Sequence, residues 1–175
     1  MKALFTGFFA ILALSSTALA IDPLEPLQEA LIKRHQAITN NSCDLEAPVP
    51  EETYHLGSGR KLVLIPCISG AYQTSYRGYT MDEKLTDIQP LMVLSYDPLS
   101  KSVVAELDLT SPSFNLKTGT LSTFAKGRGI GDCGQSSQTK IKVTAYGISV
   151  STTEIRDKSK CDGKMTNWPV VFKQK

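Results

Sequence analysis

The chain has 175 residues, of which 19 are lysine or arginine and 17 are aspartate or glutamate, so its formal net charge is +2. A chain of this length is expected to form one domain with its own hydrophobic core. The nearly balanced charge excludes the strongly basic surface that attracts nucleic acids or anionic membranes, so we expect no nucleic-acid partner.

The first twenty residues have the pattern of a secretory signal peptide. Lys2 precedes an apolar run from Ala3 to Leu14, and the small-residue stretch Ala18-Leu19-Ala20 follows. This run is too short for a permanent membrane span, and no later stretch is apolar enough, so we expect no stable membrane insertion. We predict cleavage near Ala20 and a protein of the periplasm or one that is secreted.

The cysteines predict disulfides. Four of them, an even number, follow the signal segment: Cys43, Cys67, Cys133 and Cys161. In an oxidising compartment this predicts two bridges, for which three pairings can be drawn. We favour Cys43 with Cys67 and Cys133 with Cys161, since sequential pairing closes modest loops, and each bridge would stabilise the fold by about 3 kcal/mol. No cysteine or histidine spacing fits a zinc site, so we expect no metal and no other cofactor.

The segment after the signal predicts a helix and then a loop. Asp22 can cap a helix, Pro23 suits its first turn, and apolar residues recur at helical spacing up to Ile38. Residues 39–50 are rich in asparagine and proline and predict a loop that carries Cys43. We expect residues 21–50, this helix and loop, to pack as one unit with a β-rich domain over residues 51–175.

Beyond the loop the hydrophobic period becomes that of strands. Tyr54–Leu56 and Lys61–Ile65 flank a glycine turn, and the second is apolar on both faces, which indicates a central strand. In residues 103–109 we expect a half-buried strand with every odd-numbered residue on its buried face. The remaining strands are predicted at Ala71–Tyr76, Gln89–Tyr96, Ile141–Ala145, Ile148–Glu154 and Trp168–Phe172.

These elements define the expected fold class as α+β and β-rich. Strands at roughly regular spacing after a single helix argue against alternating βαβ units. We therefore expect a mostly antiparallel curved sheet or sandwich with one N-terminal helix and two disulfides. An all-β barrel is the alternative.

Several motifs give the chain a family resemblance over residues 62–172. In order they are Pro66-Cys67-Ile68-Ser69-Gly70-Ala71-Tyr72, Leu116-Lys117-Thr118-Gly119-Thr120-Leu121, Lys126-Gly127-Arg128-Gly129-Ile130-Gly131-Asp132-Cys133-Gly134, and Cys161 with Trp168-Pro169. Their order resembles a family of small exported bacterial proteins that is catalogued as a domain of unknown function. The resemblance implies a periplasmic or secreted domain and no established activity. The chain departs from the family pattern at Gln73, where asparagine is usual.

The glycine-rich stretch Lys126–Gly134 is open to two interpretations. Backbone amides beside Lys126 and Arg128 could cradle a phosphate, but the spacing matches neither the dinucleotide fingerprint nor the P-loop. We favour a turn or bulge that brings Cys133 to Cys161 while Arg128 or Lys126 pairs with Asp132.

The tyrosines also have two interpretations. Tyr72, Tyr76 and Tyr79 could form an exposed aromatic platform for carbohydrate or protein, but aromatic residues on a strand more often pack in the core or across strands.

The sequence carries no recognisable catalytic constellation. There is no Gly-x-Ser-x-Gly elbow, the cysteines are expected in bridges, His35 lies on the helix, and His55 is expected on a surface strand. Our leading hypothesis is a non-catalytic exported envelope domain that binds a protein or a cell-wall component such as glycan, with an inhibitor or immunity-like role as one form. Its candidate contact residues are Lys126, Arg128, Asp132, Tyr72 and Tyr76. The alternative is an envelope hydrolase that uses Asp132 with Arg128 and Lys126, and it requires a carboxylate of raised pKa in a cleft.

Overall fold

A computed structural model describes residues 25–40, 42–43, 52–166 and 168–175. The predicted signal segment at 1–20, the capping residue Asp22 and most of the predicted loop lie outside the described residues. Within the described part, no helix is both long and apolar enough to cross a membrane.

Helix α1 runs from Glu25 to Thr39, in agreement with the helical spacing of its sequence. Pro26 lies in its first turn, where a missing amide hydrogen costs no helical hydrogen bond. The buried face of the helix carries Leu31, His35 and Thr39, which are spaced four residues apart and so lie on one side. The helix ends at Thr39, and the next residue, Asn40, adopts a left-handed conformation with φ of 46°.

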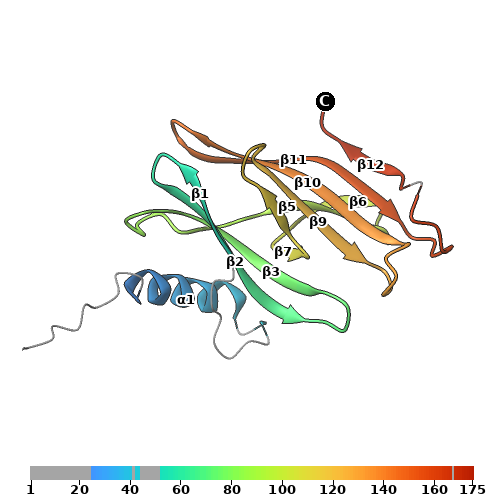
Figure 1. The fold of residues 1–175 in the computed structure, drawn as a ribbon, viewed down its shortest axis with the longest axis horizontal. Coiled ribbons are helices and arrows are strands. Elements are labelled where there is room, and N and C mark those ends of the chain that lie inside the picture. The colour runs from blue at the N-terminus through green and yellow to red at the C-terminus, as the bar shows by residue number, and fades with distance from the viewer. Residues whose placement is uncertain (1–24, 41, 44–51, 167) are drawn as a thin grey trace, which may run out of the picture.

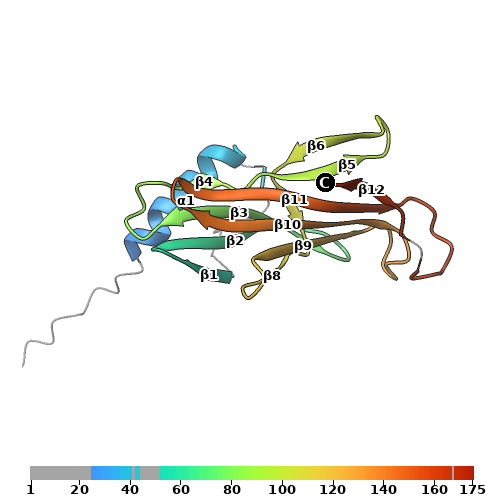
Figure 2. The same ribbon diagram turned by 90° about the horizontal axis from the view of Figure 1, so that it is seen from above.

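The strands form two larger antiparallel sheets and a separate hairpin (Figures 1 and 2). The first sheet has the order β1-β2-β3-β4, with β7 also paired to β3. Its strands are β1 Glu52–Gly57, β2 Arg60–Ser69, β3 Thr74–Asp82, β4 Gln89–Pro90 and β7 Asp108–Thr110.

The second sheet has the order β12-β11-β10-β9-β8, and β10 and β11 are its longest strands. Its strands are β8 Ser113–Asn115, β9 Thr120–Lys126, β10 Gly134–Thr144, β11 Gly147–Lys158 and β12 Val170–Lys173. The hairpin consists of β5 Val93–Asp97 and β6 Ser102–Glu106, and it lies beside β11 in Figure 2. None of the sheets closes on itself, so the barrel alternative is wrong and the α+β, β-rich class is confirmed.

Strand β2 is the centre of the molecule, as its two apolar faces predicted. On one face, Leu62 and Leu64 pack in a core that the second sheet and β5 complete. On the other face, Val63 and Ile65 pack with Leu31 of α1 and with two β3 residues. In Figure 1 the helix accordingly lies below β2 and β3, while β9 to β12 lie above them. The molecule therefore has three layers, helix on sheet on sheet.

Two of the predicted strands are wrong in detail. Residues 103–109 are not one half-buried strand, because Val103 and Ala105 are exposed on β6 and only Leu109, on β7, is fully buried. The chain leaves the hairpin after Glu106 and joins the first sheet at Asp108. Similarly, residues 89–96 divide between β4 and β5, which belong to different sheets.

Both predicted disulfides are confirmed. Cys43 is bonded to Cys67, which ties the segment after α1 to β2, and Cys133 is bonded to Cys161. There is no free cysteine. Since disulfides persist in oxidising compartments, the two bridges are consistent with a protein that works outside the cytosol.

Candidate functional site

Two loops that the sequence singles out lie together at one end of the molecule. The β2–β3 turn, residues 70–73, and the glycine-rich β9–β10 loop, residues 127–133, both occur at the right-hand end of Figure 1. The ring of Tyr72 lies against Gly129, where an added Cβ would stand 3.1 Å from the ring atom Cε1. Glycine at this position therefore allows a close approach that any side chain would disturb.

Gln73 fastens the two loops to each other. Its Nε2 donates hydrogen bonds to the Ser111 hydroxyl, at 2.9 Å, and to the Phe124 carbonyl, while its Oε1 accepts one from the Lys126 amide. The Gln73 carbonyl also accepts a hydrogen bond from the Gly70 amide at 2.9 Å, which closes the turn. Gln73 is thus a polar link between the β2–β3 turn, β9 and Ser111.

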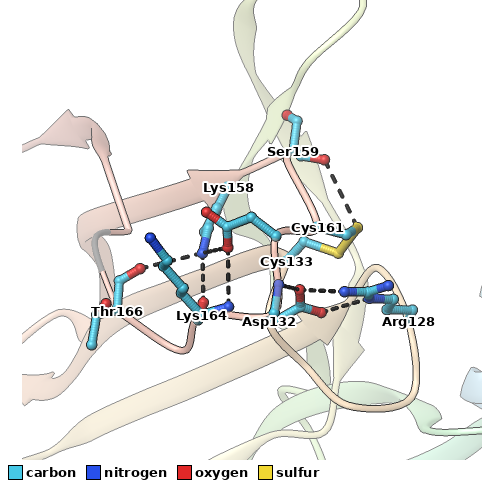
Figure 3. A network of polar contacts seen from close by, with 10 residues as sticks. Arg128, Asp132, Cys133, Lys158, Ser159, Cys161, Lys164 and Thr166 are labelled. Atoms are coloured by element: carbon cyan, nitrogen blue, oxygen red, sulfur yellow. Dashed lines mark hydrogen bonds and ion pairs between the residues drawn. A yellow bond between two sulfur atoms is a disulfide. The ribbon is translucent and has the colours of Figure 1, made fainter.

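An ion pair holds the glycine-rich loop from inside. Arg128 donates from Nε to Asp132 Oδ1 at 2.7 Å and from Nη2 to Oδ2 at 2.6 Å, a bidentate arrangement. Figure 3 shows this pair. The Gly163 amide donates to the same Oδ2 at 2.5 Å. Lys126 and Arg128 were both candidate partners of Asp132, and the residue that forms the ion pair is Arg128.

This environment keeps Asp132 ionised. Its side chain has no exposed surface. The hydrogen bonds from Arg128, followed by that from the Gly163 amide, hold the pKa of the carboxyl well below its usual range, against the opposing effect of desolvation. The hydrolase hypothesis requires the reverse, a carboxyl whose pKa is raised. Asp132 therefore has the features of a structural group rather than a proton donor.

The bridge from Cys133 to Cys161 connects this loop to the segment after β11. Gly127 makes room for it, because a Cβ there would lie 2.9 Å from Cys133 Sγ. The Gly127 amide also donates a hydrogen bond to the Cys133 carbonyl at 2.8 Å. The structure therefore supports the interpretation of the glycine-rich stretch as a turn built around the bridge.

Lys158 stabilises the segment that carries Cys161, a role that the sequence analysis did not predict. The residue is only 8% exposed, and its Nζ donates to Asp162 Oδ1 at 2.8 Å and to the Lys164 carbonyl at 2.5 Å. A longer contact of 3.3 Å reaches the Thr166 carbonyl (Figure 3). The glycine-rich loop and the 159–166 segment are thus held by a disulfide, an ion pair and a buried lysine.

The three tyrosines do not form one platform. Strand β3 begins at Thr74, so Tyr72 lies in the turn and is 69% exposed, whereas the sequence placed it on a strand face with Tyr76. Tyr76 is half-buried and packs against the sandwich core. Tyr79 is buried under α1. Of the three, Tyr72 alone is a large exposed side chain.

Two isoleucines join Tyr72 at the surface. Ile130 is 63% exposed in the glycine-rich loop, and Ile68, at the end of β2, is 40% exposed. Ile68, Tyr72 and Lys126 line a shallow hollow of about 480 Å³. We call Ile68, Tyr72, Lys126, Arg128 and Ile130 the Tyr72 surface.

The histidines are remote from this surface. His35 is buried under α1, where its Nδ1 is 2.8 Å from the Tyr79 hydroxyl. Burial, followed by the charge of Arg77, lowers the pKa of His35. His55 is exposed on β1, as predicted. Among the described residues there is no cluster of three or more histidine, cysteine, aspartate or glutamate side chains that could hold a metal ion.

The fold and this site define an α+β domain of open antiparallel sheets with two disulfides and a braced pair of loops. The chain belongs to the family described as "Protein of unknown function (DUF1176)", whose model matches residues 13–175. The resemblance to a family of unknown function is thereby confirmed. No curated protein and no solved structure matches the chain.

Proposed function

We propose that this protein is a non-catalytic binding domain of the cell envelope and that the Tyr72 surface is its contact site. The observation that carries the proposal is the combination of exposed apolar side chains with rigid loops. Tyr72 and Ile130 are both more than three-fifths exposed, at 69% and 63%. They stand on loops held by the Cys133–Cys161 bridge, the Arg128–Asp132 pair and Gln73.

Rigid loops favour binding because little conformational entropy is lost when the partner arrives. Tyrosine and arginine are also enriched among the residues that contribute most to protein interfaces. The Arg128 guanidinium remains 46% exposed although it pairs with Asp132, so it can still contact a partner. A surface that served only to close a turn would have no need of Tyr72 and Ile130.

A protein partner fits this surface better than a glycan. An aromatic ring alone suits a sugar face, but this surface also exposes Ile68 and Ile130, and such aliphatic area is buried more readily by a protein than by a polar sugar. The partner we expect is therefore an envelope protein, and an inhibitor or immunity-like role is one form that such binding would take. Binding to a cell-wall glycan is the competing outcome.

The proposed location is the periplasm or the exterior, after removal of residues 1–20. The two disulfides support it, because such bridges form in oxidising compartments. The charged start, the short apolar run and the small residues before Ile21 support it as well.

Capture of partners from an envelope extract tests the proposal. The bait proteins are the wild type, Tyr72→Ala, Ile130→Ser, and Tyr146→Ala as a matched control. Tyr146 is fully exposed in the β10–β11 turn, outside the Tyr72 surface. We expect the wild type and Tyr146→Ala to capture one reproducible protein that both other variants lose. Equal capture by all four baits would contradict the proposal, and selective retention on purified peptidoglycan would point to the glycan instead.

A further inference from the structure

The inner face of the second sheet changes from apolar to polar along β9 and β10. Leu121 and Ile141 on this face belong to the sandwich core. Two residues further along β9 the same face carries Thr123, whose cross-strand partner on β10 is Ser137. Inner positions of a sandwich are normally apolar, so hydroxyl groups at this depth call for an explanation.

These hydroxyls line a cavity of about 190 Å³ between the second sheet, the β5–β6 hairpin and β7. Glu106 of β6 together with Asp108 and Thr110 of β7 lines the opposite side. Gln135 also lines the cavity, and its side chain binds the backbone of Tyr96 in both directions, at 3.0 and 2.7 Å, which fixes the hairpin over the sheet. Strands β5, β6, β7, β9 and β10 therefore all contribute residues to the lining of the cavity.

Some of the polar lining is already paired, and some is not. Thr123 and Ser137 share a hydrogen bond of 2.7 Å between their hydroxyls. Asp108 Oδ1 lies 3.2 Å from Arg77 Nη1 in an ion pair, yet that oxygen is buried without a well-formed hydrogen bond. Glu106 is partly buried, and among the described residues no side chain forms a hydrogen bond or ion pair with its carboxylate. The cavity therefore contains one carboxylate that is paired with Arg77 and one without a partner among the described residues.

We propose that this cavity is a binding site for a small hydroxylated ammonium compound, such as an amino sugar. An uncompensated carboxylate attracts a cation and repels an anion, and the neighbouring hydroxyl groups can both donate and accept hydrogen bonds. The volume corresponds to roughly six water molecules, which suits one small molecule and excludes a peptide chain. The inference does not depend on the Tyr72 surface, because neither Tyr72 nor Ile130 lines this cavity.

Protein-observed NMR titration of the purified protein tests this site with three probes: glucosamine, glucose and glucuronate. They share a ring of similar size and differ in charge. We expect glucosamine to cause saturable shifts at the amides of Thr123, Ser137 and Glu106. The affinity for glucose should be at least about tenfold lower, because glucose lacks the ammonium group and so loses one charge-assisted hydrogen bond. Glucuronate should cause no saturable shift at these amides.

Two variants and a control complete the test. Glu106→Gln preserves the shape of the side chain and removes its charge, so the glucosamine affinity should fall about tenfold. Thr123→Val removes a hydroxyl from the cavity wall and should weaken all hydroxylated probes. Glu83→Gln, at an exposed turn, should change nothing. No saturable shift with glucosamine, or equal shifts with all three probes in the wild type, would overturn the proposal and leave a cavity that holds only water.

Discussion

The ring of Tyr72 rests on the backbone of Gly129, and this contact brings two motifs of the sequence into one surface. Gln73 links the first motif to the Lys126 amide of the second, and Asp132 holds the glycine-rich loop through Arg128 and the Gly163 amide. The exposed ring is therefore supported on one side by Gly129, and its outer face is open. This relationship connects the fold to the proposed binding role.

Gly129→Ala should disturb the surface more than the fold. The new methyl would lie 3.1 Å from Tyr72 Cε1 and 3.2 Å from Cδ1, so the ring has to move. Because the ring is exposed, it can swing outward, and we expect a stability loss of less than about 1 kcal/mol. Partner capture should fall in parallel with that of Tyr72→Ala. Urea denaturation and envelope capture measure the two effects, and unchanged capture would show that the ring position is irrelevant.

Gln73→Asn should loosen the link between the two loops. The asparagine side chain is shorter by one methylene, so it cannot form the hydrogen bonds with Ser111, Phe124 and Lys126 at the same time. We expect the free energy of unfolding to fall by about 1–2 kcal/mol. Gln138→Asn, the same change at an exposed position of β10, is the control. Equal stabilities of the two variants in urea denaturation would contradict the assigned role of Gln73.

Lys158→Met should release the segment that carries Cys161. Methionine keeps much of the side-chain volume but removes the donor to the Lys164 carbonyl and one of the two donors to Asp162 Oδ1, at a cost of about 1–3 kcal/mol. Lys160→Met, at an exposed neighbouring position, should cost almost nothing. Hydrogen exchange of residues 159–166 should also accelerate in Lys158→Met alone. An unchanged exchange pattern would show that the disulfide suffices to hold this segment.

His35 should make the fold sensitive to mild acid. Burial and Arg77 lower its pKa in the folded protein from the ordinary 6.5, so below that pH the unfolded chain binds a proton that the folded protein refuses. Stability should therefore fall as the pH drops below about 6.5. In His35→Gln that fall should be reduced, whereas the exposed-site variant His55→Gln should behave as the wild type. Identical pH profiles of all three proteins in chemical denaturation would contradict this account.

The parts of the fold that sequence reasoning predicted correctly depend on local patterns. Strand β2 is apolar on both faces, and a strand of that kind belongs between two packed layers. The Arg128–Asp132 pair was also foreseeable, because opposite charges four positions apart in a tight turn are close in space.

The parts that it missed depend on tertiary contacts. Alternation in residues 103–109 continues smoothly across Glu106, yet the chain changes sheet there, and nothing in the local pattern marks the change. The acceptors of Lys158 and the partners of Gln73 come from other segments of the folded chain. Such contacts exist only once the sheets have packed, so spacing along the sequence does not reveal them.

Site-specific photo-crosslinking in intact cells shows whether the Tyr72 surface contacts an envelope protein. A photoreactive phenylalanine derivative replaces Tyr72 in one variant and the fully exposed Tyr146 in a second. After irradiation, the account predicts a discrete cross-linked product with one envelope protein at position 72 and none at position 146. The absence of any product at position 72, or the same product at both positions, would contradict it.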